Sequence, residues 1–195
     1  MTSRISLSRF RLGGAAAVLV VAAAACSGGT QLPDATNLNV VDTVQVFALN
    51  GTAIGTASAF DVVSGLVTRP EMQEQYDFAF DVDSANRALL LPGNLSGLRN
   101  SSAGLQESAT SFDEIVRAPV DDYVTDTALV LNMGTVFLAR SRSTDSFCSA
   151  YVGSIPRYGK FEVIELDLTA RTVTFKFLVN LNCGYRDLMP GLPEN

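Results

Sequence analysis

The chain has 195 residues and a formal net charge of −6, and it contains no histidine and no tryptophan. The absence of histidine excludes Ser-His-Asp and Cys-His catalysis, and with them every haem, zinc or copper site that needs a histidine ligand. The acidic balance argues against a nucleic-acid partner. We therefore expect a non-catalytic chain of one folded domain, with no cofactor and no metal site.

The first 25 residues have the organisation of a signal peptide. Arg4, Arg9 and Arg11 form a basic start, and residues 12–25 form an apolar run. This run is shorter than the ~20 residues that a transmembrane helix needs. We therefore expect residues 1–25 to be a targeting helix that is cleaved from the mature protein.

The apolar run ends in Ala-Ala-Ala-Cys at residues 23–26, which resembles the lipobox of bacterial lipoproteins, although that family more often has leucine where Ala23 stands. The resemblance implies that Cys26 is lipidated and that acyl chains attach the protein to the membrane. Because Ser27 rather than aspartate follows, it also implies sorting to the outer membrane of the cell envelope. The alternative is an ordinary signal peptide cleaved after an Ala-x-Ala site, with Cys26 incidental.

The region after the signal peptide divides into a tether and a domain. Residues 26–38 are polar, contain glycine and proline and lack periodicity, which predicts a flexible tether that carries the lipidated cysteine. Residues 39–195 then form a single domain. Its two cysteines, Cys148 and Cys183, are expected to form a disulfide, because paired cysteines in an exported chain are usually bonded.

Alternation of apolar and polar residues dominates the domain and predicts an all-β fold. We expect a β-sandwich or open barrel of about eight to ten antiparallel strands. The clearest alternation runs from Val173 to Cys183 and predicts a long strand with one buried face and one wet face. A hairpin is expected at residues 164–175 around a turn at 167–170, and a similar hairpin is expected around a turn at 83–86.

The remaining elements follow from turn and loop signals. Asn50-Gly51 is a strong hairpin signal and predicts that strand 40–49 returns directly as strand 53–63. Residues 112–117 are expected to form one short helical turn. Residues 92–110 are expected to be a long loop, and loops of this length are usually functional or disordered. Further strands are expected at residues 76–82, 87–91, 127–131, 135–140 and 147–152, with a connection at 64–75.

Five acidic residues are candidates for carboxylate chemistry: Asp81, Asp83, Asp121, Asp122 and Asp126. The first two resemble the start of a calcium loop, but the segment lacks the glycine and the final glutamate of an EF-hand, and a solvated turn is favoured. Two of the five would have to converge in a cleft to serve a hydrolase.

Exposed arginine, tyrosine and loop residues are the expected contact surface, because these residue types are favoured at binding sites. The candidates are Leu95, Leu98, Arg99, Asn100, Leu105, Tyr151, Arg157 and Tyr158. The alternative for the last three is packing over the end of the sandwich. Lys160 and Lys176 are also candidates for a Ser-Lys dyad, although a solvated lysine is the ordinary outcome.

Between residues 112 and 175 the order of signals resembles that of uncharacterised bacterial cell-envelope lipoproteins. The matching segments are FDEI at 112–115, AP at 118–119, GTVFLAR at 134–140, YGKFEV at 158–163 and RTVTF at 171–175. By pattern the nearest characterised relatives are the haemophore-like β-sandwich lipoproteins. The resemblance implies the fold and the envelope location, but not haem binding, because those haemophores hold haem through histidines.

Three functions are compatible with these patterns. The first is a lipid-anchored, non-catalytic envelope protein that binds a small molecule or a protein partner. The second is an envelope hydrolase that uses carboxylates. The third is a structural or assembly subunit of the envelope, which a large exposed apolar patch or an unpaired sheet edge would favour.

Overall fold

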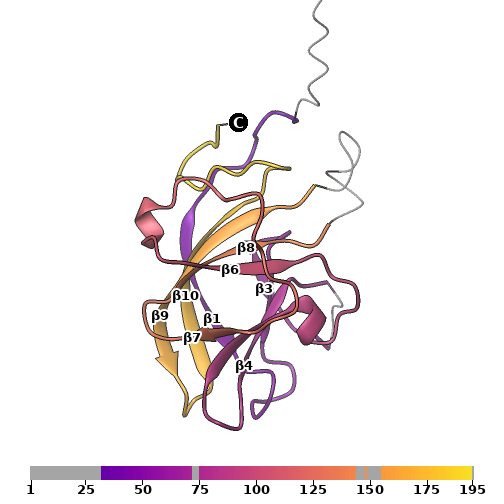
Figure 1. Cartoon of the computed structure of the whole chain (residues 1–195), viewed down its shortest axis with the longest axis vertical. Coiled ribbons are helices and arrows are strands. Elements are labelled where there is room, and N and C mark those ends of the chain that lie inside the picture. The colour runs from indigo at the N-terminus through magenta and orange to yellow at the C-terminus, as the bar shows by residue number, and fades with distance from the viewer. Residues whose placement is uncertain (1–31, 72–74, 144–147, 149–154, 195) are drawn as a thin grey trace, which may run out of the picture.

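The described chain is a β-sandwich. The computed structural model describes residues 32–71, 75–143, 148 and 155–194, and within them ten strands form two antiparallel sheets of five strands each (Figure 1). The sheets face each other and do not close into a barrel. The predicted all-β sandwich of about eight to ten strands is therefore confirmed. In the described part of the chain, no helix has the length and apolar character to cross a membrane.

The first sheet is built on the hairpin that the sequence predicts most clearly. In spatial order, its strands are β1 (Val41–Phe47), β10 (Thr172–Asn180), β9 (Tyr158–Asp167), β8 (Val136–Arg140) and β6 (Gly104–Ser108). The turn between β9 and β10 is held by the Asp167 carboxylate, which accepts the amide hydrogens of Thr169 and Ala170 at 2.8 Å each. Local Asx chemistry therefore forms this turn, as predicted.

The second sheet contains the other predicted hairpin. In spatial order, its strands are β3 (Leu66–Thr68), β2 (Ala59–Asp61), β4 (Phe78–Val82), β5 (Ala88–Pro92) and β7 (Leu129–Leu131). Asp83 closes the β4–β5 turn by accepting the amide hydrogens of Ala85 and Arg87. Its other oxygen pairs with the Arg87 guanidinium at 2.7 Å.

Phenylalanine side chains from both sheets fill the space between them. Phe60 and Phe78 come from the second sheet and stack at a centroid distance of 5.4 Å. Phe161 of the first sheet meets each of them edge-on, at 5.1 and 5.3 Å. Such pairs contribute about 0.5–1.5 kcal/mol each beyond the area they bury. Phe175 and Phe177, on the predicted buried face of β10, join the same cluster.

The predicted hairpin at Asn50-Gly51 is wrong. β1 pairs with β10 in the first sheet, whereas β2 lies in the second sheet, so residues 48–58 cross from one sheet to the other. Tertiary contacts hold this crossing: the Asn50 amide groups donate to Asp81, and Arg171 Nε donates to the Asn50 carbonyl at 2.7 Å. The turn at Asn50-Gly51 is therefore part of a crossing between the two sheets and not of a hairpin within one sheet.

Two other segments contain secondary structure that was not predicted. The expected loop at 92–110 contains η1 (Gly93–Leu95) and the strand β6, and the expected connection at 64–75 contains β3. β7 and β8 are both present, but they belong to different sheets. The strand expected at 147–152 lies outside the described residues except for Cys148.

The outer face of the first sheet is partly covered, which corrects the prediction of one fully wet face. The predicted helical turn is the short 3₁₀ helix η2 (Phe112–Glu114), and the segment that it opens crosses this face. A second core cluster forms there from Phe112, Ile115, Ala118, Tyr123, Val136, Leu138, Tyr158, Leu178 and Leu188. Alternation therefore identifies the face that is buried between the sheets, but it does not tell that a later segment of the chain covers part of the other face.

The folded body begins before Asn39. The Asn182 side chain accepts the amide hydrogens of Thr36 and Asn37, and the Tyr185 hydroxyl donates to the carbonyl of Pro33. These contacts fix residues 33–37 to the segment after β10, so the body includes part of the stretch predicted as a tether. The first described residues and the C-terminus lie at the same end of the sandwich (Figure 1).

Candidate functional site

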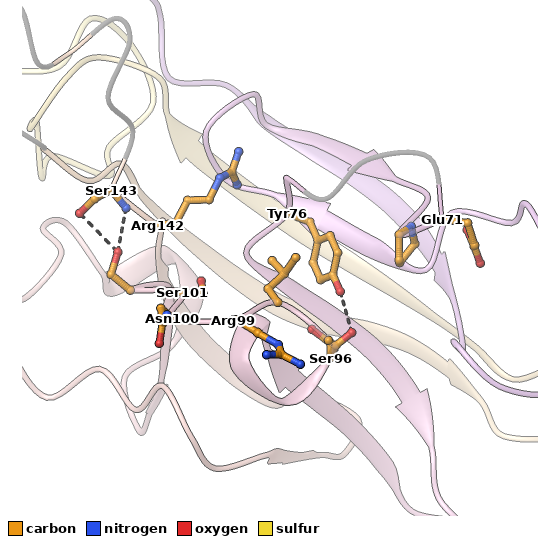
Figure 2. Close-up of a pocket in the computed structure, with 12 residues that line it drawn as sticks. Glu71, Tyr76, Ser96, Arg99, Asn100, Ser101, Arg142 and Ser143 are labelled. Carbon is orange, nitrogen blue, oxygen red and sulfur yellow. Dashed lines mark hydrogen bonds between the residues drawn. The ribbon is translucent and has the colours of Figure 1, made fainter.

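A polar pocket of about 850 Å³ lies between the 93–102 segment and the end of β8 (Figure 2). Its wall consists of Pro70, Glu71, Tyr76, Ser96, Gly97, Leu98, Arg99, Asn100, Ser101, Ser102, Arg142 and Ser143. The buried Tyr76 supports this wall from beneath, since its hydroxyl donates to the Ser96 carbonyl at 2.7 Å.

The 93–102 segment is held in shape by its own hydrogen bonds. The Asn94 side chain donates to the Ser101 carbonyl at 2.9 Å and accepts the Ser101 amide hydrogen at 2.8 Å. The Ser143 amide donates to Ser102 Oγ at 2.8 Å. These two residues lie just beyond the paired strands β6 and β8 of the first sheet, so this bond continues their pairing into the pocket wall.

A buried charge cluster stands behind the pocket. The Arg142 guanidinium lies 2.8 Å from Asp61 and 3.2 Å from Asp77, and its backbone amide donates to Asp77 at 2.7 Å. The second oxygen of Asp77 accepts the Val62 amide hydrogen. Because Arg142 follows β8 while both carboxylates belong to the second sheet, the cluster joins the two sheets.

Asp77 is the most strongly perturbed acid of the cluster. Burial raises its pKa to about 6, and the opposing attraction of Arg142 does not offset this desolvation. The nearby negative charge of Asp61 raises the pKa further. The carboxyl has no free approach to the pocket, because its side chain is 1% exposed. We therefore assign it to the framework of the site.

Arg99 is the free cation of the pocket. It is exposed, and it makes no hydrogen bond or ion pair with any other residue that the structure describes. The same wall carries the hydroxyl groups of Ser96, Ser101, Ser102 and Ser143. A pocket lined by a guanidinium and hydroxyls suits a ligand that carries carboxylate and hydroxyl groups.

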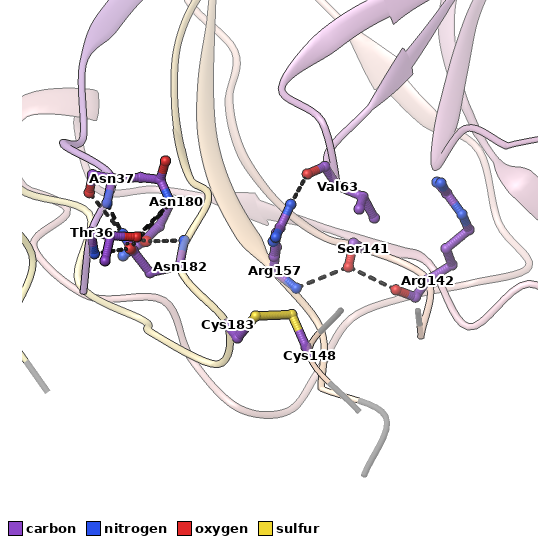
Figure 3. The surroundings of a disulfide bond; sticks show 10 residues. All are labelled: Thr36, Asn37, Val63, Ser141, Arg142, Cys148, Arg157, Asn180, Asn182 and Cys183. Carbon is purple, nitrogen blue, oxygen red and sulfur yellow. Dashed lines mark hydrogen bonds between the residues drawn. A yellow bond between two sulfur atoms is a disulfide. The ribbon is translucent and has the colours of Figure 1, made fainter. Parts of the chain in front are cut away.

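The predicted disulfide is present beside this region (Figure 3). Cys148 and Cys183 are bonded with Cα atoms 5.4 Å apart, and the bond closes a separation of 35 residues. Arg157 lies nearby and donates to the Val63 carbonyl, while its amide donates to Ser141 Oγ at 2.9 Å. Burial lowers the pKa of its guanidinium, and the charge of Asp61 opposes this shift.

The structure brings together three of the predicted surface residues, namely Leu98, Arg99 and Asn100, in the pocket wall. Leu95 is exposed close by in η1 without lining the pocket. The other described candidates lie elsewhere. Arg157 supports the region behind the pocket, as described above.

Two predicted surface residues are buried, and their expected exposure is wrong. Leu105 belongs to the main core cluster and Tyr158 to the second one, so Tyr158 follows the alternative of packing rather than exposure. Leu105 sits on β6, whose inward side chains enter the sandwich, and Tyr158 is covered by the segment after η2. Tyr151 and Cys26 lie outside the described residues.

Sequence reasoning missed Tyr76, Arg142 and the serines of the pocket wall. The concentration of serine and asparagine between residues 94 and 102 is a signal for part of this wall. Nothing local in the sequence marks Tyr76 or Arg142, because each reaches the pocket from a different strand end.

The five candidate carboxylates do not form a cleft. Asp81 and Asp83 are engaged at the β4–β5 hairpin by Asn50 and Arg87, as described above. Asp121, Asp122 and Asp126 belong to the connection between β6 and β7 and line no shared cavity with the hairpin pair. Among the residues that the structure describes, no group of three metal-binding side chains is found.

The two candidate lysines have structural partners. Lys160 is buried, and its ammonium donates to the carbonyls of Phe112 and Ile115 at 2.9 Å each. Lys176 pairs with Asp113 at 2.9 Å. Each ammonium also lies over the Phe112 ring, at 4.5 and 4.3 Å from its centre. Neither has a serine among its described partners, so the Ser-Lys dyad has no basis here.

Comparison of the chain with protein-family models, with curated proteins and with solved structures found no match.

Proposed function

We propose that this protein is a lipid-anchored, non-catalytic protein of the bacterial outer membrane that binds a ligand in the pocket of the 93–102 segment. The observation that carries the proposal is a preformed polar pocket with an unpaired arginine, Arg99, among the residues described. Rigid, hydrogen-bonded walls lower the ordering cost of binding. The ligand is a polar small molecule or a segment of an envelope polymer or partner that carries carboxylate and hydroxyl groups.

The anchor in this proposal is supported by the sequence. The Ala-Ala-Ala-Cys sequence at residues 23–26 resembles a lipobox, and a basic start and an apolar run precede it. The disulfide between Cys148 and Cys183 is consistent with an oxidising compartment. Both observations favour export from the cytoplasm.

Non-catalytic binding is favoured over the hydrolase by the same pocket. Among the residues that the structure describes, the wall offers hydroxyls, an amide and two guanidinium groups, and Glu71 is the one carboxylate that lines it. A glycosidase needs a pair of carboxyl groups at a set separation. The assembly-subunit alternative gains no support from this pocket.

Site-directed photocrosslinking in native membranes tests the proposal. A photoreactive amino acid at position 99 is expected to capture a specific adduct. The same group at position 87, an exposed arginine side chain of the β4–β5 hairpin, is the matched control and is expected to give none. Equal products from both positions, or none from position 99, would contradict the proposal.

Once the adduct is identified, the role of Arg99 can be measured directly. We expect Arg99→Ala to weaken binding about 10- to 100-fold, because a hydrogen bond to a charged group contributes roughly 1.5–3 kcal/mol. Arg87→Ala should leave the affinity unchanged in isothermal titration calorimetry. Replacing the whole segment 92–110 is a poorer test, because this segment contains β6 from Gly104 onward and the replacement would remove that strand.

A further inference from the structure

A small apolar face lies where the chain enters the folded body. Leu38 and Val40 are 64% and 62% exposed, and Leu192 is 57% exposed. Pro190 is exposed beside them. These four residues, the entry patch, surround an isolated antiparallel bridge between Asn39 and Gly191 that extends the N-terminal end of β1.

The backbone pattern makes the entry patch point away from the body. Asn39 is buried, and its side chain donates to the carbonyls of Asp187 and Met189 at 3.0 Å each. Successive side chains of an extended segment point to opposite sides, so Leu38 and Val40 face outward. In the antiparallel bridge, Leu192 stands opposite Leu38 and shares its side.

The chain length between the proposed anchor and the body limits where this patch can be. The Tyr185 hydroxyl holds Pro33 and the Asn182 side chain holds Asn37, so the segment that leads from Pro33 to the entry patch is fixed to the body. Six residues lie between Cys26 and Pro33, so the two residues are seven steps apart in the chain. Seven steps span at most ~25 Å when fully extended and roughly 15 Å as a flexible coil.

From this geometry we infer that the entry patch rests on the lipid bilayer, with its apolar side chains in the interfacial zone. The inference depends on the proposed lipid anchor at Cys26. A short tether keeps this end of the sandwich at the bilayer surface, where Leu38, Val40 and Leu192 gain an apolar environment. The chain is acidic, so the contact uses apolar side chains rather than attraction to anionic headgroups.

The lack of tryptophan in the chain allows a clean fluorescence test. Single-tryptophan variants Leu38→Trp and Leu192→Trp of the lipidated protein, purified from native membranes, are reconstituted into phosphatidylcholine vesicles with brominated acyl chains. We expect a blue-shifted emission maximum and quenching several-fold stronger than in the control. The control is Ile54→Trp, because Ile54 is 94% exposed in the crossing loop at the other end of β1. Circular dichroism confirms that each variant is folded.

The outcomes separate this inference from the anchor. Flotation of the protein with the vesicles tests the anchor, and a protein that does not float overturns both. If the protein floats but residues 38 and 192 are quenched no more than residue 54, the anchor stands and the bilayer contact is wrong. A blue shift at residue 38 without quenching by brominated lipid shows a protein occupant instead and also overturns the inference.

Discussion

Asp77 links the stability of the sandwich to pH. Burial raises its pKa to about 6, above the value of ~3.9 for an unfolded aspartate. The folded protein therefore binds this proton more tightly than the unfolded chain does. The contribution of the carboxyl to the free energy of unfolding is fully present below about pH 4 and is lost as the pH rises through 6.

We expect wild-type protein to gain about 1 kcal/mol of unfolding free energy relative to Asp77→Asn when the pH falls from 8 to 5. Asparagine keeps an oxygen that accepts the Val62 amide hydrogen but does not titrate. Urea unfolding at both pH values measures the difference. Arg142 and Asp61 are the charged groups that act on position 77, and both proteins contain them. Parallel pH profiles would show that Asp77 ionises normally in the folded state.

The buried Lys160 side chain stabilises the fold by satisfying backbone carbonyl groups. Its ammonium is the donor to two carbonyls of the segment that covers the outer face of the first sheet. Lys160→Met keeps the length of the side chain but leaves the carbonyls of Phe112 and Ile115 without this donor. We expect a loss of about 2–4 kcal/mol in unfolding free energy, since each buried unpaired group costs about 1–3 kcal/mol.

Lys176→Met is the matched control for Lys160. Its partner, Asp113, has an 83% exposed side chain, and exposed ion pairs contribute about 1 kcal/mol or less. Both variants are measured by chemical unfolding. Equal losses would contradict the proposed role of Lys160.

At the scale of elements, the disulfide joins the segment between β8 and β9 to the end of β10. Cross-linking two points 35 residues apart lowers the entropy of the unfolded chain. We expect the double variant Cys148→Ser/Cys183→Ser to lose about 3–4 kcal/mol of unfolding free energy.

Wild-type protein unfolded in the presence of a reductant should reproduce the loss caused by this double variant. The bond can also be tested chemically: thiols 148 and 183 should resist alkylation in the unfolded protein until a reductant is added. Free alkylation without a reductant would show that the native protein lacks the bond.

The accuracy of the predicted elements follows from how local each signal is. The β4–β5 and β9–β10 hairpins were predicted correctly because Asp83 and Asp167 hold their turns through neighbouring amides. The Asn50-Gly51 signal is equally local, but its strands separate into two sheets. The reason is long-range, since β1 has its hydrogen-bonding partner in β10.

At the scale of the whole molecule, two layers of phenylalanine-rich sheet leave both proposed binding surfaces at strand ends. The candidate pocket lies between the end of β8 and the 93–102 segment, which connects β5 of the second sheet to β6 of the first. The entry patch lies where residues 38–40 meet residues 190–192. Neither surface interrupts the central core. Variants at Arg99 or Leu38 are therefore expected to change binding or membrane contact while the fold is kept.

The sequence by itself determined the fold class, the pairing of Cys148 with Cys183 and two hairpins, because alternation, cysteine count and Asx turns are local properties. Part of the candidate site was also foreseeable, since Leu98, Arg99 and Asn100 are neighbours in the chain. Only the tertiary structure decided which sheet each strand joins and that the outer face of β10 is also partly covered. These outcomes depend on packing between residues that are far apart in sequence, as when Arg142 reaches Asp61 and Asp77, and no local pattern records such contacts.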